Sequence, residues 1–382
     1  MPLAPARPAK RQRRLAPEPA APAVKGNRSS ASASKSKSRL RLLWLAVPAV
    51  AGLAFYLSTG RGLGWAPEYT PSRRDPFVVA DLPGRGKGLV AVRDIMQGEL
   101  VIQESPLFTV PQSISESPVT LISRLLDGVS PEGRAAFLNL SYVHLPEGMD
   151  LENNPGEVAL AIFQTNAVAA GDDRAGIFPR MARLNHGCSS AFNLVYTWRD
   201  REQQLFVHAL RNISKGQELL TTYTDTKRTR NERREFLSQQ YGFTCACAVC
   251  SLDAAASKLS DERLTAIARY YEHLRSWGRG AISGVEAIDT INKIWKLEDE
   301  EGYWSERGRL AADGAWIAAS HSDASAARLW GRLAVEWYTY ELGADSDLVL
   351  ATQKTVDRPE KHRAWGSRHQ PLAVGVPLTN GA

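Results

Sequence analysis

The stretch RLNHGCSSAFN, residues 183–193, places an Asn and a His side by side and a cysteine two residues later. Asn, Gly and Ser favour turns, and a lone buried cysteine usually behaves as a small hydrophobic residue, so the stretch alone predicts a polar loop. The other three cysteines, Cys245, Cys247 and Cys250, lie close together. Their C-x-C-x-x-C spacing is too tight for separate disulfides and indicates a metal site, although the cluster supplies only three ligands.

The composition is typical of a globular protein, with 43% hydrophobic and 23% charged residues in 382 positions. The formal net charge is +6, but the excess of Lys and Arg is concentrated before residue 42, where Glu18 is the only acidic residue. The basic pI therefore describes the N-terminal tail, and no direct nucleic-acid binding is expected of the folded part.

The N-terminal region predicts three segments. Residues 1–38 are rich in Ala, Pro, Ser and basic residues and predict a disordered tail. Residues 39–60 predict a transmembrane helix, because 42–57 carry no charge and 42–60 approach the length needed to enter a bilayer. Residues 61–76 predict a linker. We expect a single-pass membrane location, with a mitochondrial location as an alternative, or a nuclear or cytoplasmic one if the apolar segment does not insert.

The remainder predicts an α+β protein. Residues 77–226 contain short β-like runs separated by glycine turns, with a helical pattern at about 115–170. Residues 227–251 combine a charged helix with the cysteine cluster. In 252–365, apolar residues recur at three- and four-residue spacing, which predicts a helical domain and a possible surface for a protein partner. Residues 366–382 predict a disordered tail.

Three further motifs accompany the opening stretch: GRGKGLVAV at 84–92, GQELLTTYTD at 216–225 and YGFTCACAVC at 241–250. In this order they resemble the SET-domain protein lysine methyltransferases, in particular the split-SET branch related to SET-and-MYND proteins. The MYND finger itself is missing, because residues 104–160 contain no cysteine. The resemblance covers residues 77–251. It implies a SET-domain β-fold of several small sheets with a helical insert, a post-SET zinc loop and an α-helical C-terminal domain.

The resemblance also implies an activity, the transfer of a methyl group from S-adenosylmethionine to a lysine of a histone or non-histone protein substrate. Tyr223 matches the catalytic tyrosine, and the motif positions that match cofactor contacts are Arg85, Gly86, Lys87, Gly88, Asn166, Asn185, His186 and Phe243. Candidate walls of the lysine channel are Tyr241, Tyr196 and Phe192, although core packing is the more usual role for the last two. A structural zinc ion would take the four thiolates of Cys188, Cys245, Cys247 and Cys250, with sulfur separations of about 3.5–4 Å.

The loop that follows Cys188 departs from the family pattern. Gly187 stands where the family usually has Ser, the usual Pro is missing, and Asn193 comes two positions late. We therefore expect this loop to have a different shape. The departures leave open a non-catalytic SET-derived module that binds a peptide or protein and is tethered to a membrane. A second alternative is a zinc-stabilised scaffold in which the glycine turns are only structural.

Overall fold

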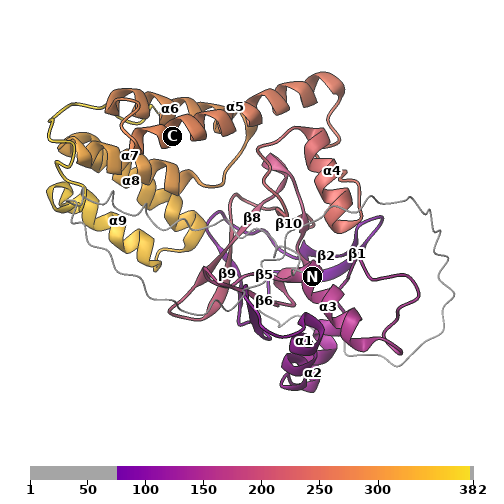
Figure 1. Ribbon diagram of the computed structural model, residues 1–382. Coiled ribbons are helices and arrows are strands. Elements are labelled where there is room, and N and C mark those ends of the chain that lie inside the picture. Colours follow the sequence, from indigo (N-terminus) through magenta and orange to yellow (C-terminus); the bar gives the residue numbers. More distant parts are fainter. Residues whose placement is uncertain (1–74, 379–382) are drawn as a thin grey trace, which may run out of the picture.

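The computed structural model describes residues 75–378, which form a strand-rich part followed by a helical part (Figure 1). The strands lie between helices α1–α3, within residues 118–166, and helices α5–α9, within residues 254–357. The predicted α+β class with several small sheets is confirmed. The predicted basic tail at 1–38, the predicted span at 39–60 and most of the predicted linker at 61–76 lie outside the described residues.

The predicted location needs a correction. Among residues 75–378, no helix is both long enough and apolar enough to cross a membrane. The longest helix, α5 at Ala254–Gly278, carries charged residues along its length and packs against α6. This finding contradicts the predicted single-pass membrane location. The predicted membrane contact falls on residues 42–60, which lie outside the described residues.

The first sheet has the order β1-β2-β10-β7 and joins segments that are far apart in the chain. Strands β1 (Phe77–Leu82) and β2 (Gly86–Ala91) form an antiparallel hairpin, and β10 (Glu218–Thr221) pairs antiparallel with β2. On its other edge, β10 pairs in parallel with the two-residue strand β7 (Asn185–His186). Parallel strands need a long connection, and here it is the whole chain from residue 187 to 217.

Two further three-stranded sheets complete the β part. One has the order β3-β9-β8, with strands at Leu100–Glu104, Gln204–Ala209 and Leu194–Arg199. The other has the order β4-β6-β5, with strands at Thr109–Pro111, Arg174–Gly176 and Val168–Ala169. The first two sheets share one core, because fully buried leucines of both meet there: Leu89, Leu194, Leu205 and Leu219. Each such side chain contributes roughly 1.5–3 kcal/mol by leaving water.

Three helices occupy the region predicted as a helical insert. They are α1 (Pro118–Asp127), α2 (Pro131–Leu138) and α3 (Pro155–Asn166), and each has proline in its first turn, where the missing N–H costs nothing. Their core contains three phenylalanines, with the ring of Phe108 5.7 Å from Phe137 and 6.0 Å from Phe163. This small core supports the sheets from the side opposite the long helices.

Helix α4 (Arg230–Tyr241) has sharply defined ends. At its start, Thr229 and Glu232 form a capping box in which each side chain bonds the other residue's backbone N–H. At its end, Gly242 adopts φ +70°, a left-handed conformation that side chains disfavour. The chain therefore turns away immediately before Phe243 and the cysteine cluster.

The helical domain consists of α5, α6 (Gly284–Glu301), α7 (Arg307–Ser320), α8 (Ala324–Leu342) and α9 (Asp347–Asp357). Its centre holds an arginine among tryptophans: the Arg307 guanidinium lies 4.9, 4.5 and 4.8 Å from the rings of Trp295, Trp304 and Trp337. The Asp299 carboxylate, 2.6 Å away, neutralises this buried cation. The aromatic cluster is thus filled by the protein's own side chain.

The predicted disorder of the C-terminal segment also needs a correction. Residues 366–378 pack on the helical domain and are not the disordered tail that composition predicts. Val374 is 2% exposed, and its backbone N–H donates to Asp323 Oδ2 at 3.0 Å. The Gly375 carbonyl accepts from Trp330 Nε1 at 3.1 Å, and Leu378 N–H donates to Asn292 Oδ1 at 3.0 Å. A segment held by such long-range backbone hydrogen bonds has no periodic spacing of apolar residues, so its order could not be predicted from the sequence.

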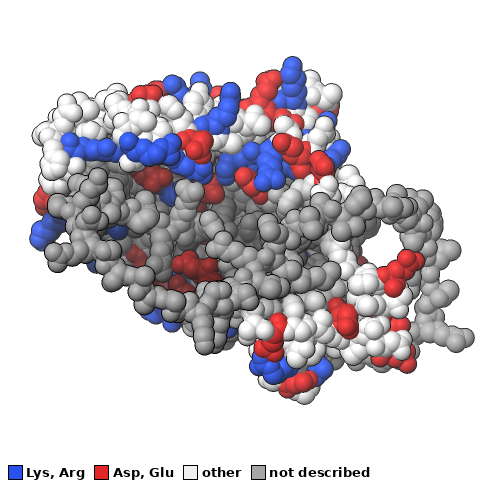
Figure 2. Space-filling model, in the orientation of Figure 1, with Lys and Arg blue, Asp and Glu red and all other residues white. Residues whose placement is uncertain are grey.

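The outer surface of the helical domain carries charges of both signs. On the face drawn in Figure 2, Lys and Arg lie among Asp and Glu over these helices. Several are paired along one helix, as Lys258 is with Glu262 and Lys293 with Asp289. Such a surface is typical of a solvated helix face.

The helical domain is joined to the β part through buried polar contacts. Glu301, at the end of α6, accepts hydrogen bonds through Oε1 from Ser189 Oγ at 2.8 Å and Ser260 Oγ at 2.6 Å. Its other oxygen pairs with Arg263 at 2.8 Å. Ser189 follows Cys188 directly and adopts φ +45°, so a helix end of one domain holds a left-handed residue of the other.

We predict that Glu301→Gln lowers the free energy of unfolding by about 1–3 kcal/mol, because the amide NH₂ cannot replace the carboxylate that faces Arg263. Urea denaturation followed by circular dichroism measures the loss. The matched control is Glu300→Gln, one position earlier, whose ion pair with Lys296 spans 4.0 Å on the surface. Equal stability of the two variants would contradict the assigned role of Glu301.

Candidate active site and metal centre

The site is built where β7 lies beside β10. Asn185 pairs with Leu220 and His186 with Thr221, so Tyr223, two residues beyond β10, comes next to the stretch 183–193. Asn193 fixes this arrangement because its side chain accepts from Leu220 N–H at 2.8 Å and donates to the Glu218 carbonyl at 2.9 Å. Asn193 thus still bonds β10, although it comes two positions later than the Asn of the family motif.

A charged network links β7 to the β1–β2 turn. Arg85 forms an ion pair with Glu218 at 3.0 Å and donates to the His186 carbonyl at 3.0 Å, while Glu218 accepts from Asn185 Nδ2 at 2.9 Å. Gly88 lies against this network, since a Cβ there would stand 2.7 Å from Asn185 Nδ2. Sequence reasoning placed Arg85, Gly88 and Asn185 at the site but missed Glu218, although it belongs to the Gly-Gln-Glu turn that begins β10.

The His186 ring occupies the centre of the site. Its Nδ1 accepts from the Tyr223 backbone N–H at 3.0 Å, and its Nε2 lies 3.1 Å from Cys188 Sγ. The ring centroid is 5.3 Å from that of Tyr223 and 6.4 Å from that of Phe243. One imidazole thus touches the residues assigned to catalysis, cofactor stacking and metal binding.

Tyr223 is held at both ends. Besides the backbone bond to His186, its hydroxyl donates to the Leu184 carbonyl at 2.7 Å, and its side chain is buried. The ring of Tyr241, from the last residue of α4, lies 5.0 Å away. The two tyrosine rings therefore lie side by side, and a lysine channel between them stays a prediction.

The four cysteines converge. Cys188 Sγ lies 4.0 Å from Cys245 Sγ and 3.6 Å from Cys250 Sγ, and the four sulfurs all lie within 4.8 Å of one another. All four are buried and free of disulfides. Arg234 of α4, which sequence reasoning missed, holds their loop by donating to the carbonyls of Cys245 at 3.0 Å and Cys250 at 2.9 Å.

The thiols strongly perturb one another. Hydrogen bonds with the other three cysteines, of which the bond with Cys245 has the largest effect, raise the pKa of the Cys188 thiol. The hydrogen bond with Cys188 has the largest effect on Cys250 and lowers its pKa, which is about 7. The pKa of Cys247 is also lowered, first by its hydrogen bond with Cys188. Four buried thiolates repel one another, so they can all ionise only around a cation. The donor set and spacing fit tetrahedral Zn²⁺, whose Zn–S bonds of about 2.3 Å place the sulfurs about 3.8 Å apart.

The loop after Cys188 is tightly folded. A Cβ on Gly187 would stand 2.8 Å from the Phe192 nitrogen and 2.9 Å from the Ala191 carbonyl carbon, so the loop folds back onto this glycine. The turn between them is the 3-10 helix η2 (Ser189–Ala191). Glycine at 187 is therefore a requirement of this loop, although the family usually has serine there.

A third missed residue, Glu104, supports the segment that leads into residues 183–193. Glu104 accepts hydrogen bonds from the backbone N–H groups of Arg180 and Met181, both at 2.9 Å. These groups begin the turn that leads to Leu184. Burial raises the pKa of Glu104 to about 7, against the effect of these two bonds.

Three predicted site residues contact other parts of the described chain. Asn166 is buried, and its amide donates to the carbonyls of Ser141 at 2.7 Å and Ile162 at 2.8 Å. Phe192 packs edge-on against Tyr303 of the helical domain, with ring centroids 5.8 Å apart. Tyr196 lies in the core shared by the first two sheets. Phe192 and Tyr196 both pack in apolar cores.

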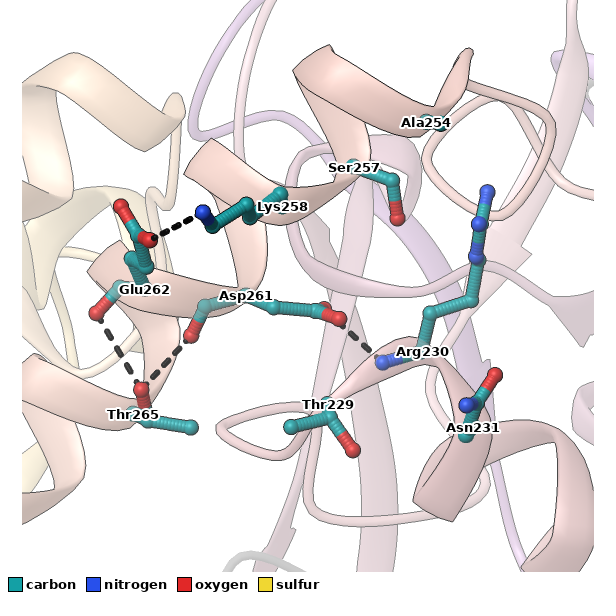
Figure 3. A pocket seen from close by; sticks show the side chains of 9 residues that line it. All are labelled: Thr229, Arg230, Asn231, Ala254, Ser257, Lys258, Asp261, Glu262 and Thr265. Atoms are coloured by element: carbon teal, nitrogen blue, oxygen red, sulfur yellow. Dashed lines mark hydrogen bonds and ion pairs between the residues drawn. The ribbon is translucent and has the colours of Figure 1, made fainter.

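A separate hollow of about 310 Å³ lies between the start of α4 and α5 (Figure 3). Its lining is polar and of mixed charge, and Asp261 crosses it to accept from Arg230 N–H at 2.8 Å. The cysteines and Tyr223 do not line it. The capping box takes up the N–H groups of Thr229 and Glu232, and Asp261 takes up that of Arg230, at this end of α4.

We predict that Gly187→Ser, which restores the usual family residue, lowers the free energy of unfolding by about 1–3 kcal/mol, because the new Cβ meets backbone atoms that cannot move independently. Thermal and urea unfolding measure the loss. Gly278→Ala is the control, since no heavy atom lies within 4 Å of a Cβ there. A Gly187→Ser protein as stable as the wild type would show that the loop is not as tight as described.

Comparison with known proteins agrees with this geometry. A family model described as the SET domain matches residues 86–224, a range that includes Asn185, His186 and Tyr223. Histone-lysine N-methyltransferase set5 of Schizosaccharomyces pombe (strain 972 / ATCC 24843) is 29% identical over 310 residues, which cover 80% of this chain and 89% of that protein. Histone-lysine N-methyltransferase SMYD3 of Mus musculus is 32% identical over 106 residues, 28% of this chain and 24% of that protein.

Among solved structures, Rubisco LSMT bound to AdoMet matches with 12% identity and a TM-score of 0.32, covering 78% of this chain and 92% of that chain. The assignment depends instead on the sequence relatives and on the matched family model. Taken with the ordered motifs and their convergence around His186, these matches identify a SET domain at residues 86–224.

Proposed function

We propose that the protein transfers methyl groups from S-adenosylmethionine to lysine side chains of a protein substrate. The observation that carries this proposal is the position of the His186 ring, in contact with Tyr223 and Cys188 and near Phe243, inside the SET-domain match. The relatives set5 and SMYD3 are named histone-lysine N-methyltransferases, which supports a lysine in a histone or another protein as the acceptor.

The turn beside β7 offers space for the cofactor. Gly86 has φ +68°, and no heavy atom lies within 4 Å of where its Cβ would be, so the backbone here is open to a ligand. We propose that S-adenosylmethionine lies against the backbone of residues 85–88, with Lys87, Asn185, His186 and Phe243 around it. Arg85 and Asn166 bond main-chain carbonyls and would shape the site without gripping the ligand themselves.

When bound, S-adenosylmethionine supplies a methyl group on a positively charged sulfur. The lysine nitrogen forms a bond to this carbon as the carbon–sulfur bond breaks, which leaves S-adenosylhomocysteine and a methylated lysine. The amine must be neutral to react, yet the pKa of lysine is about 10.4 in water. Burial between the rings of Tyr223 and Tyr241 would lower that pKa by desolvation, and the released proton passes to solvent.

The chain's own contribution is alignment. Tyr223 is fixed through its backbone by His186 and through its hydroxyl by the Leu184 carbonyl, so its oxygen stands at a set position to accept from the lysine amine. Holding the reacting nitrogen in line is worth several orders of magnitude in rate. A structural zinc ion on the four cysteines would join the loop that bears Asn185 to the segment that bears Phe243.

We predict that Tyr223→Phe lowers turnover about a hundredfold and changes the affinity for S-adenosylmethionine less than about twofold, because the hydroxyl acts on the geometry of the reaction. Incorporation of radiolabelled methyl groups into histones measures turnover, and isothermal titration calorimetry measures affinity. The control is Tyr142→Phe, an exposed tyrosine. Wild-type turnover in Tyr223→Phe would remove Tyr223 from the mechanism.

We predict one zinc ion per chain, lost in Cys188→Ser together with at least tenfold of the affinity for S-adenosylmethionine, although no sulfur is proposed to touch the cofactor. Atomic absorption measures the metal, and calorimetry measures the affinity. Ala248→Ser, an exposed position in the same loop, is the control. If Cys188→Ser retains a full equivalent of zinc, Cys188 is not a ligand.

A further inference from the structure

The two nitrogens of His186 point to different partners. Nδ1 lies 3.0 Å from the Tyr223 backbone nitrogen, which has only a hydrogen to offer, so Nδ1 must accept. A neutral imidazole with an accepting Nδ1 carries its proton on Nε2. That proton faces Cys188 Sγ at 3.1 Å. The backbone of Tyr223 thus selects the tautomer that donates to the sulfur.

The sulfur is the acceptor that this tautomer needs. A metal-bound cysteine is a thiolate, and hydrogen bonds to a charged acceptor are stronger than those between neutral groups. Cys188 would receive this side-chain donor while its own backbone N–H donates to Cys247 Sγ at 3.4 Å. Groups that donate to the ligands of a metal orient those ligands and tune the affinity for the metal.

We infer that His186 is a positioning residue whose side chain ties the metal centre to the catalytic tyrosine, with Nε2–H donating to Cys188 and Nδ1 fixing the backbone of Tyr223. The inference rests on the proposed function for the presence of zinc and for the role of Tyr223. It goes beyond that function by giving one imidazole two separable tasks. Loss of the metal would then disturb Tyr223 directly, through a single side chain.

Two substitutions separate the two bonds. In His186→Asn, the carbonyl oxygen takes the place of Nδ1 and keeps an acceptor for Tyr223, but nothing reaches Cys188. In His186→Gln, the amide nitrogen takes the place of Nε2 and keeps a donor for Cys188, but Tyr223 loses its acceptor. His186→Phe keeps the ring and removes both bonds. His208→Gln is the control for the loss of a buried histidine, because His208 is also buried but lies on a different strand, β9.

Neither measurement depends on methyl transfer. The first is the rate at which the full-length protein releases zinc to a chromophoric chelator, supported by the thiolate-to-cobalt absorption band of the Co²⁺-substituted protein. The second is the NMR shift of the Tyr223 amide proton in protein labelled with [¹⁵N]tyrosine, with the resonance assigned through Tyr223→Phe.

We expect His186→Asn and His186→Phe to release zinc about tenfold faster or more and to shift the cobalt band, while His186→Gln and His208→Gln behave like the wild type. We expect the Tyr223 amide to lose its downfield shift in His186→Gln and His186→Phe but to keep it in His186→Asn. If His186→Phe does not fold, the Asn and Gln variants still give opposite results.

The inference is overturned if His186→Asn and His186→Gln release zinc at the same rate, or if their Tyr223 amide shifts coincide. A wild-type protein that binds no metal also overturns it, because Nε2 then lacks a thiolate. A protein that binds zinc and shows the expected pattern, but methylates nothing, would instead contradict the proposed function and leave the role of His186 intact.

Discussion

Two residue pairs of parallel sheet, Asn185 with Leu220 and His186 with Thr221, are the constraint on which the rest of the site depends. They place the opening stretch beside the chain that leads to Tyr223, and they do so across more than thirty residues of connection. So short a strand pair cannot hold alone. Asn193 bonds β10 from the loop, Arg85 and Glu218 brace it from the turn, and the cysteine cluster closes its other end.

Several polar side chains hold the paired strands β7 and β10 in place. Nearest are the imidazole of His186 and the phenol of Tyr223, each with its hydrogen-bonding groups assigned to a partner. Next come Arg234 and Glu301, which contact the loops that bear the cysteines and Ser189. Because Glu301 belongs to the helical domain, that domain takes part in shaping the site. A buried ionic contact of this kind fixes one arrangement more than it adds stability.

Much of the architecture follows from local patterns in the sequence. Three features depend only on residues that are close together in the sequence. They are the glycine turns between β-like runs, the helical spacing after Cys250 and the C-x-C-x-x-C spacing. What sequence reasoning missed depends on distant contacts. Glu301 looks like an ordinary surface acid near a helix end, and residues 366–378 are ordered by backbone bonds to Asp323 and Asn292.

The tryptophans give the two parts of the molecule different optical properties. Within residues 75–378, Trp198 is the only tryptophan before α5, whereas Trp295, Trp304 and Trp337 surround Arg307 in the helical domain. Intrinsic fluorescence therefore reports mainly on the helical domain, and ultraviolet absorption of metal–thiolate bonds would report on the other part. Comparing the two during denaturation reveals whether the chain unfolds as a single cooperative unit or in two steps.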